Sequence, residues 1–182
     1  MGDERFVSHP WQTLRVADIA PYLAPDGSEI RELPRTSRGS LAHCRLPAGA
    51  VTIPVRHRTI EEIWYVLNGR GQVWRGPDGD PEPVEPGVAL TIPLGASFQF
   101  RADADTDLEM ILSTMPPWPG GDEAVRVEGP WTPTVHLSPY RPSFAWPEPA
   151  ALRAADSART GSRHVPRDRS PPRFARGDRS CH

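Results

Sequence analysis

The chain has no lysine, only two cysteines and no long run of apolar residues. Since no stretch of 18 apolar residues occurs, and no charged start leads into an apolar core, we expect neither a membrane-spanning helix nor a secretory signal. Cys44 falls in the middle of the chain and Cys181 is the penultimate residue, so a structural disulfide is not expected. These absences predict a cytoplasmic protein with no membrane partner.

Acidic and basic residues are unevenly distributed. Residues 1–149 carry 13 arginines against 20 acidic residues, whereas residues 150–182 carry eight arginines against three aspartates. Because phosphate binding needs a basic face, the acidic body predicts no nucleic-acid partner. The arginines after residue 150 are scattered among Ser, Pro and Gly, which is typical of a solvated disordered tail, although such a tail could also touch an anionic polymer.

Short apolar-rich segments separated by turn residues begin at Ser28. They predict strands at residues 28–33, 39–46, 51–57, 62–68, 72–75, 82–84, 88–93, 97–102 and 108–114. These segments are rich in β-branched and aromatic residues, and no long helix lies between them, which is typical of an antiparallel sandwich or barrel. We therefore divide the chain into an N-terminal extension (1–27), a β-barrel (28–115), a strap (116–149) and a disordered arginine-rich tail (150–182).

The strap is rich in proline and aromatic residues. It holds nine prolines, interleaved with Trp118, Trp131, Tyr140, Phe144 and Trp146. Because proline removes ladder donors, we expect an irregular extension rather than sheet interior. Its aromatic side chains could lie over the barrel and cover an edge or a partner subunit. Residues 147–156 could form a helical turn or two.

Two spaced patterns stand on the predicted strands. The first is Gly49-AVTIP-Val55-Arg56-His57-RTIE-Glu62-IWYVLN-Gly69, and the second is Gly87-VALTI-Pro93-Leu94-Gly95-AS-Phe98-QFR-Ala102. Seventeen residues separate them. The glycines stand at predicted hairpin ends, where a positive φ is often needed, and Pro93-Leu94-Gly95 is a turn sequence.

These spacings resemble the two signatures of the cupin superfamily, and residues 25–120 resemble small single-domain bacterial cupins of the mannose-6-phosphate-isomerase-like group. The resemblance implies an all-β fold, the double-stranded β-helix or jelly-roll barrel, with the proline-rich C-terminal extension outside it. It also implies a site in the wide mouth of the barrel. The fold alone says little about the reaction.

The resemblance further implies which residues bind the metal: in metal-binding cupins, the two signatures supply three histidines and one glutamate. Val55 and Phe98 occupy two of the histidine positions here, so only His57 and Glu62 remain as ligands. Two ligands seldom hold a divalent ion against water, and we expect either no cofactor or a weakly held Zn, Fe, Mn or Ni ion. Because strand side chains alternate, either His43 or Cys44, but not both, could add a third donor.

The two retained residues have two interpretations. His57 and Glu62 could act as a catalytic acid/base couple, or they could be a polar pair kept only for structure. The barrel's aromatic and aliphatic side chains likewise could be ordinary core or could line a ligand pocket oriented by Arg45 or Gln72. The predicted pocket residues are Val55, Trp64, Phe98, Phe100, Trp74 and Arg45.

We therefore expect a cupin-domain protein that binds a small, partly apolar organic molecule in its barrel. Its role could be sensing, sequestration, or isomerase or cyclase chemistry that does not rely on a strongly bound metal. A metal-dependent enzyme (isomerase, polyketide cyclase or dioxygenase) and a non-catalytic partner-binding protein with a filled barrel are the alternatives. An open edge strand invites pairing, so we also expect a homodimer.

Overall fold

A computed structural model of the protein describes residues 11–135. The strands are β1 (Tyr22–Leu23), β2 (Glu29–Arg35), β3 (Ser40–Leu46), β4 (Val55–His57), β5 (Glu61–Asn68), β6 (Gly71–Gly76), β7 (Glu82–Val84), β8 (Ala89–Ile92), β9 (Ser97–Ala102), β10 (Leu108–Met115) and β11 (Ala124–Arg126). The helical elements of this part of the chain are two 3-10 turns, η1 (Val16–Asp18) and η2 (Gly121–Glu123). The predictions for Tyr140, Phe144, Trp146, the turns at 147–156 and the tail lie outside the described residues.

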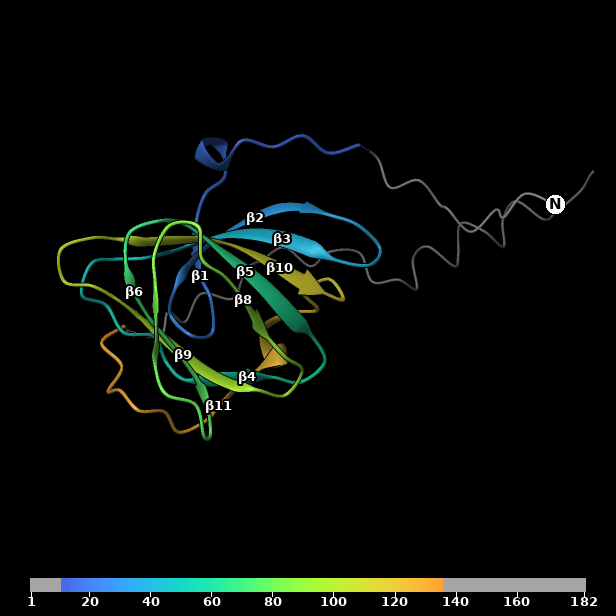
Figure 1. The fold of residues 1–182 in the computed structure, drawn as a ribbon. Coiled ribbons are helices and arrows are strands. Elements are labelled where there is room, and N and C mark those ends of the chain that lie inside the picture. The colour runs from blue at the N-terminus through green and yellow to red at the C-terminus, as the bar shows by residue number, and fades with distance from the viewer. Residues whose placement is uncertain (1–10, 136–182) are drawn as a thin grey trace, which may run out of the picture. The chain divides into compact units, whose positions relative to one another are not determined.

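The strands form two antiparallel sheets (Figure 1). One has six strands in the order β1-β2-β3-β10-β5-β8, and the other has five in the order β11-β4-β9-β6-β7. The chain passes repeatedly from one sheet to the other, so sequence neighbours such as β4 and β5 lie in different sheets. This is the jelly-roll arrangement, and it confirms the all-β fold class.

Each predicted strand finds a counterpart, with one clear difference. Residues 51–54 are not part of β4, because Pro54 has no N–H to donate and Val51 makes only an isolated bridge to Arg101. The sequence did not predict β1 or β11, which have two and three residues. Such short strands show no alternation that a pattern could detect.

Strand alternation separates the core from the outer surface. On β10, Leu108, Met110 and Leu112 are buried, with the residues between them only partly so. On β3, Cys44 is fully buried in the apolar core, whereas the His43 Nε2 lies 3.1 Å from the Glu109 carboxylate on the other face. Burial raises the pKa of the Cys44 thiol, so this side chain is an inert core residue.

Gly69 connects β5 to β6 and shows why a signature position is glycine. Its φ is 78°, in the left-handed region that other residues rarely adopt. A Cβ at this position would collide with the backbone carbonyl of Asp107. The glycine therefore allows the chain to turn tightly beside the loop that precedes β10.

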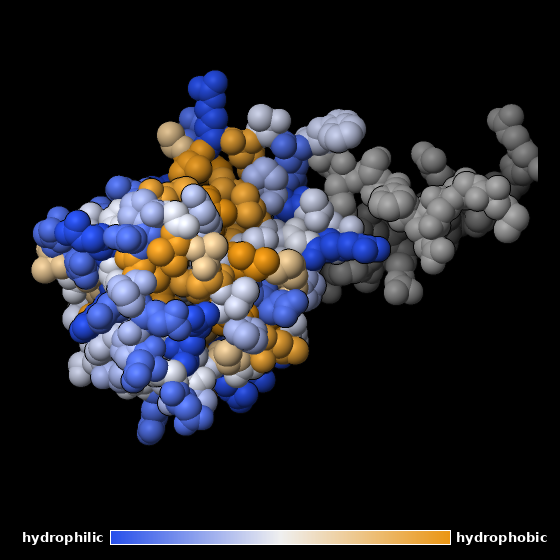
Figure 2. Space-filling model, in the orientation of Figure 1, coloured by the Kyte–Doolittle hydropathy of each residue, from blue (hydrophilic) through white to orange (hydrophobic). Residues whose placement is uncertain are grey.

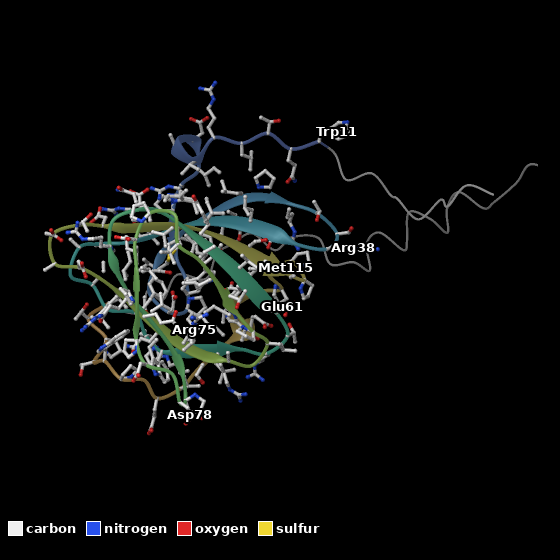
Figure 3. All side chains as sticks on the ribbon, viewed as in Figure 1. Trp11, Arg38, Glu61, Arg75, Asp78 and Met115 are labelled. Atoms are coloured by element: carbon white, nitrogen blue, oxygen red, sulfur yellow. The ribbon has the colours of Figure 1, made fainter. Side chains whose placement is uncertain are left out.

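The outer surface of the barrel carries an apolar patch among hydrophilic residues (Figure 2). Ile63, Tyr65 and Leu67 of β5 point outward and are 47%, 47% and 44% exposed. At the N-terminal end of the described chain, Trp11 is fully exposed and points away from the barrel (Figure 3). No helix within residues 11–135 has the length and hydropathy needed to cross a membrane.

Candidate functional site

A cavity of about 100 Å³ lies inside one end of the barrel. Its walls come from both sheets and from the chain that follows β10. Glu61, at the start of β5, and Met115, at the end of β10, are register partners and lie close together in Figure 3. Their inward-facing neighbours Glu62 and Thr114 line the cavity, so it lies at this end of the barrel.

His57 and Glu62 meet at this cavity, as the signature spacing predicts. His57 ends β4 and Glu62 is the second residue of β5, and each is only 4% exposed. The His57 Nδ1 lies 3.8 Å from the Glu62 Oε2, which is too far for a hydrogen bond. Instead, the Trp64 Nε1–H donates to the Glu62 Oε2 at 2.8 Å. The His57 Nδ1 is buried without a hydrogen-bond partner among the described residues.

Burial keeps both groups uncharged. It raises the pKa of Glu62 to about 8; the hydrogen bond from Trp64 opposes this shift, and the Asp26 and Glu123 carboxylates add to it. Burial also lowers the pKa of His57 to about 4, against the opposing effect of Glu123. Between these values the site holds a protonated carboxyl beside a neutral imidazole. The pair is therefore not an ion pair at neutral pH, despite its proximity.

Two aromatic rings account for the burial of His57. The Phe98 ring meets the imidazole edge-on at a centroid distance of 5.1 Å, and the Trp118 ring does so at 5.4 Å. Both rings also line the cavity. The imidazole is therefore surrounded by apolar ring surface instead of water, and this loss of hydration disfavours its charged form.

The residues at the signature positions do not fit a bound divalent metal. Val55 and Phe98 are register partners on β4 and β9, and they are 1% and 2% exposed inside the barrel. The Phe98 ring packs against Trp64 at 5.3 Å as well as against His57, so it fills the place of a donor with apolar surface. Within residues 11–135, no group of three or more His, Cys, Asp or Glu side chains is arranged to hold a metal ion.

Of the predicted pocket residues, only Phe98 lines the cavity together with His57 and Glu62. Val55, Trp64 and Phe100 point into the barrel but belong to its packed core. The Trp64 ring meets Phe100 edge-on at 5.2 Å, which leaves no room between them for a ligand.

Arg45 and Trp74 lie away from the cavity. Arg45 alternates with the buried Cys44 and Leu46, so it faces outward, where it binds Glu29 at 2.9 Å and Asp107 at 2.6 Å. Trp74 follows the buried Val73 on β6 and is likewise on the opposite face of its strand. Gln72, the other proposed orienting group, accepts a hydrogen bond from Arg101. None of these side chains can orient a molecule in the cavity.

Sequence reasoning missed several residues of the cavity. Leu112 and Thr114 on β10 line it, and the inward alternation of that strand could have identified them. Trp118 belongs to the strap whose aromatic side chains were expected over the barrel, but this stretch has no periodicity that would have placed its ring at the cavity. Its backbone N–H donates to the Ser40 Oγ at 3.0 Å, which ties it to β3.

The chain is similar to known proteins over the barrel. The family model described as "Cupin domain" matches residues 42–114. An uncharacterized protein of Methanocaldococcus jannaschii is 33% identical over 112 residues, which cover 59% of this chain and 88% of that protein.

Solved structures share the fold at lower identity. The polyketide cyclase RemF from Streptomyces resistomycificus aligns with a TM-score of 0.56 and 20% identity, covering 66% of this chain and 87% of that one. A protein of Thermotoga maritima described as a predicted oxalate decarboxylase aligns with a TM-score of 0.51 and 22% identity, covering 58% and 99%. At these identities the likeness concerns the fold alone.

Proposed function

Since this chain belongs to the cupin superfamily, whose barrel it shares, we propose that it binds a small, partly apolar organic molecule in the cavity. We further propose that His57 and Glu62 move a proton within that molecule, in an isomerisation or cyclisation that needs no strongly bound metal. The observation that carries the proposal is the uncharged imidazole and carboxyl pair, both 4% exposed, at the wall of a mainly apolar cavity that Glu32 and Arg35 also line.

The pair can act as proton acceptor and proton donor in one step. The neutral His57 Nδ1 has no hydrogen-bond partner within residues 11–135 and can take a proton from the ligand, while the protonated Glu62 can give one to a carbonyl or leaving oxygen. The step leaves an imidazolium beside a carboxylate. Because their atoms are 3.8 Å apart, a small side-chain movement or one water can return the proton and restore the starting state.

The cavity also supports binding over the alternative of a filled, purely structural barrel. A volume of about 100 Å³ exceeds the space that a single water needs. The polyketide cyclase RemF has the same fold, which supports the view that such a barrel can accommodate ring-forming chemistry. The uncharged pair favours a hydroxyl group on the ligand, because a hydroxyl can accept a hydrogen bond from Glu62 and donate one to the His57 Nδ1. A carbonyl group could accept the hydrogen bond from Glu62.

Binding is tested with phenol, a single ring that carries one hydroxyl. Phenol should bind the full chain with a Kd of about 1 mM or tighter and should shift the NMR signals of Leu112 and Ala124, which line the cavity. Ala42→Leu places a larger side chain in the cavity wall and should abolish binding, whereas Ala89→Leu, at an exposed position on β8, should not. Shifts confined to the outer residues Ile63 and Leu67, or binding that survives Ala42→Leu, would contradict the proposal.

The homodimer stays a prediction, as do the cytoplasmic location and the mannose-6-phosphate-isomerase-like subgroup. Light scattering at micromolar concentration tests the dimer, which should have twice the 20.1 kDa mass of the chain. A mass of one chain under these conditions would show that the prediction is wrong.

A further inference from the structure

The first part of the predicted strap, residues 116–126, runs from the end of β10 back to the five-stranded sheet. We call this part the strap loop. The loop is bound to the barrel at three places. The Trp118 N–H binds Ser40 on β3, Glu123 accepts hydrogen bonds from the backbone of Thr59 and Ile60, and β11 pairs with β4. The loop thus joins both sheets at the cavity end of the barrel.

Trp118 is the large side chain that the strap loop places at the cavity. Its ring contacts the His57 ring and lines the cavity, and the side chain is only partly buried. Ala124 is the other residue of this loop at the cavity, and it has little bulk. The volume that remains for a ligand on this side therefore depends on one large indole ring.

Because the cavity is small, the Trp118 ring affects which ligands the cavity can hold. At about 100 Å³, the cavity is smaller than the apolar cavities of about 150 Å³ that take up a benzene molecule, so a single ring is already a close fit. A second fused ring cannot enter such a space unless a wall moves. The strand walls are fixed by ladder hydrogen bonds, whereas Trp118 lies in the irregular part of the strap loop, before η2 and β11, where its own hydrogen bond to the barrel is the one from its N–H to Ser40.

We propose that Trp118 is a specificity-determining residue, whose indole ring closes the cavity and limits its ligand to a single ring or a chain of similar bulk. This inference rests on the proposed function, because it assumes that the cavity binds a ligand. It gives the strap loop a role in ligand selection that its irregular sequence does not suggest.

Trp131 offers a matched control from the same region of the chain. Its backbone is held by the Gln99 side chain, and its ring lies 4.5 Å from the Arg101 guanidinium. It does not line the cavity. A variant of Trp131 thus removes an indole ring and a packing contact without changing the space around His57.

The experiment compares the affinities of phenol and 1-naphthol for the full chain by NMR titration. Wild type should bind phenol more tightly than 1-naphthol. Trp118→Ala should raise the ratio of 1-naphthol to phenol affinity by about tenfold or more, because the second ring gains the vacated space. Trp118→Phe should keep the wild-type preference, and so should Trp131→Ala.

A gain of binding for the larger ring cannot result from unfolding. If Trp118→Ala is not folded, Trp118→Leu replaces it in the test, because leucine keeps apolar bulk at this position. Trp118→Leu should show a smaller rise in the ratio of 1-naphthol to phenol affinity. An unchanged ratio in the folded variants, with phenol still bound in the cavity, overturns the inference alone. Failure of phenol to bind wild type overturns the proposed function and this inference with it.

Discussion

Glu62→Gln should stabilise the protein at neutral and alkaline pH. Burial raises the folded-state pKa of Glu62 from 4.5 to about 8, so the folded protein must keep a proton that the unfolded chain releases above pH 4.5. Wild type therefore loses stability as the pH rises from about 4.5 to 8, whereas glutamine is uncharged throughout. We expect the variant to have a free energy of unfolding about 3 kcal/mol higher at pH 7 and almost unchanged at pH 4.

Urea unfolding between pH 4 and pH 8 measures this difference. Glutamine keeps an oxygen that can accept the hydrogen bond from Trp64, so packing changes little. Glu61→Gln is the matched control, because Glu61 is the preceding residue of β5 but is exposed, and it should show no comparable gain. Parallel pH profiles for wild type and Glu62→Gln would mean that Glu62 is ionised in the folded state.

Val55→His combined with Phe98→His should create a divalent metal site where wild type has none of comparable strength. Val55 lies two residues before His57 on β4 and is paired with Phe98 on β9, so all three side chains face the barrel interior near Glu62. Three imidazoles and a carboxylate are a donor set that suits Zn²⁺ or Ni²⁺. We expect the Kd for Ni²⁺ to fall by about a hundredfold or more relative to wild type.

Isothermal titration with Ni²⁺, on protein purified without an affinity tag, provides the measurement. The double variant Val55→Leu and Phe98→Leu alters the same two core positions without adding donors and should bind no better than wild type. A folded histidine variant that gains no affinity would show that positions 55 and 98 do not converge on His57. Wild type that already binds a stoichiometric ion tightly would show that other donors complete the site.

The strands could be predicted because their alternation and their turn residues agree. β5 exposes Ile63 and Tyr65 and buries Glu62 and Trp64, as the period of two requires. The resemblance to the cupin signatures, and not the alternation, predicted that His57 and Glu62 belong to one site, and the two residues flank the connection between β4 and β5. The strands thus followed from local patterns, and the pair followed from the resemblance.

The rest of the site depends on contacts that no local pattern records. The alternation of side chains on β3, where Cys44 and Leu46 are buried, would have placed Arg45 on the outer face. The basic charge of Arg45 suggested instead that it orients a ligand. Alternation separates inner from outer residues but does not distinguish packed core from cavity wall, so Trp64 and Phe98 looked equivalent. Trp118 approaches His57 through a loop whose path is set by tertiary contacts alone.

The most direct test of the account is an NMR titration of the Glu62 side-chain carboxyl carbon, assigned by its absence in Glu62→Gln. The account holds that burial inside the barrel, with the nearby Asp26 and Glu123 carboxylates, keeps this carboxyl protonated. It predicts a single midpoint near pH 8. A midpoint near 4.5, or a carboxylate signal that moves when a chelator is added, would contradict it.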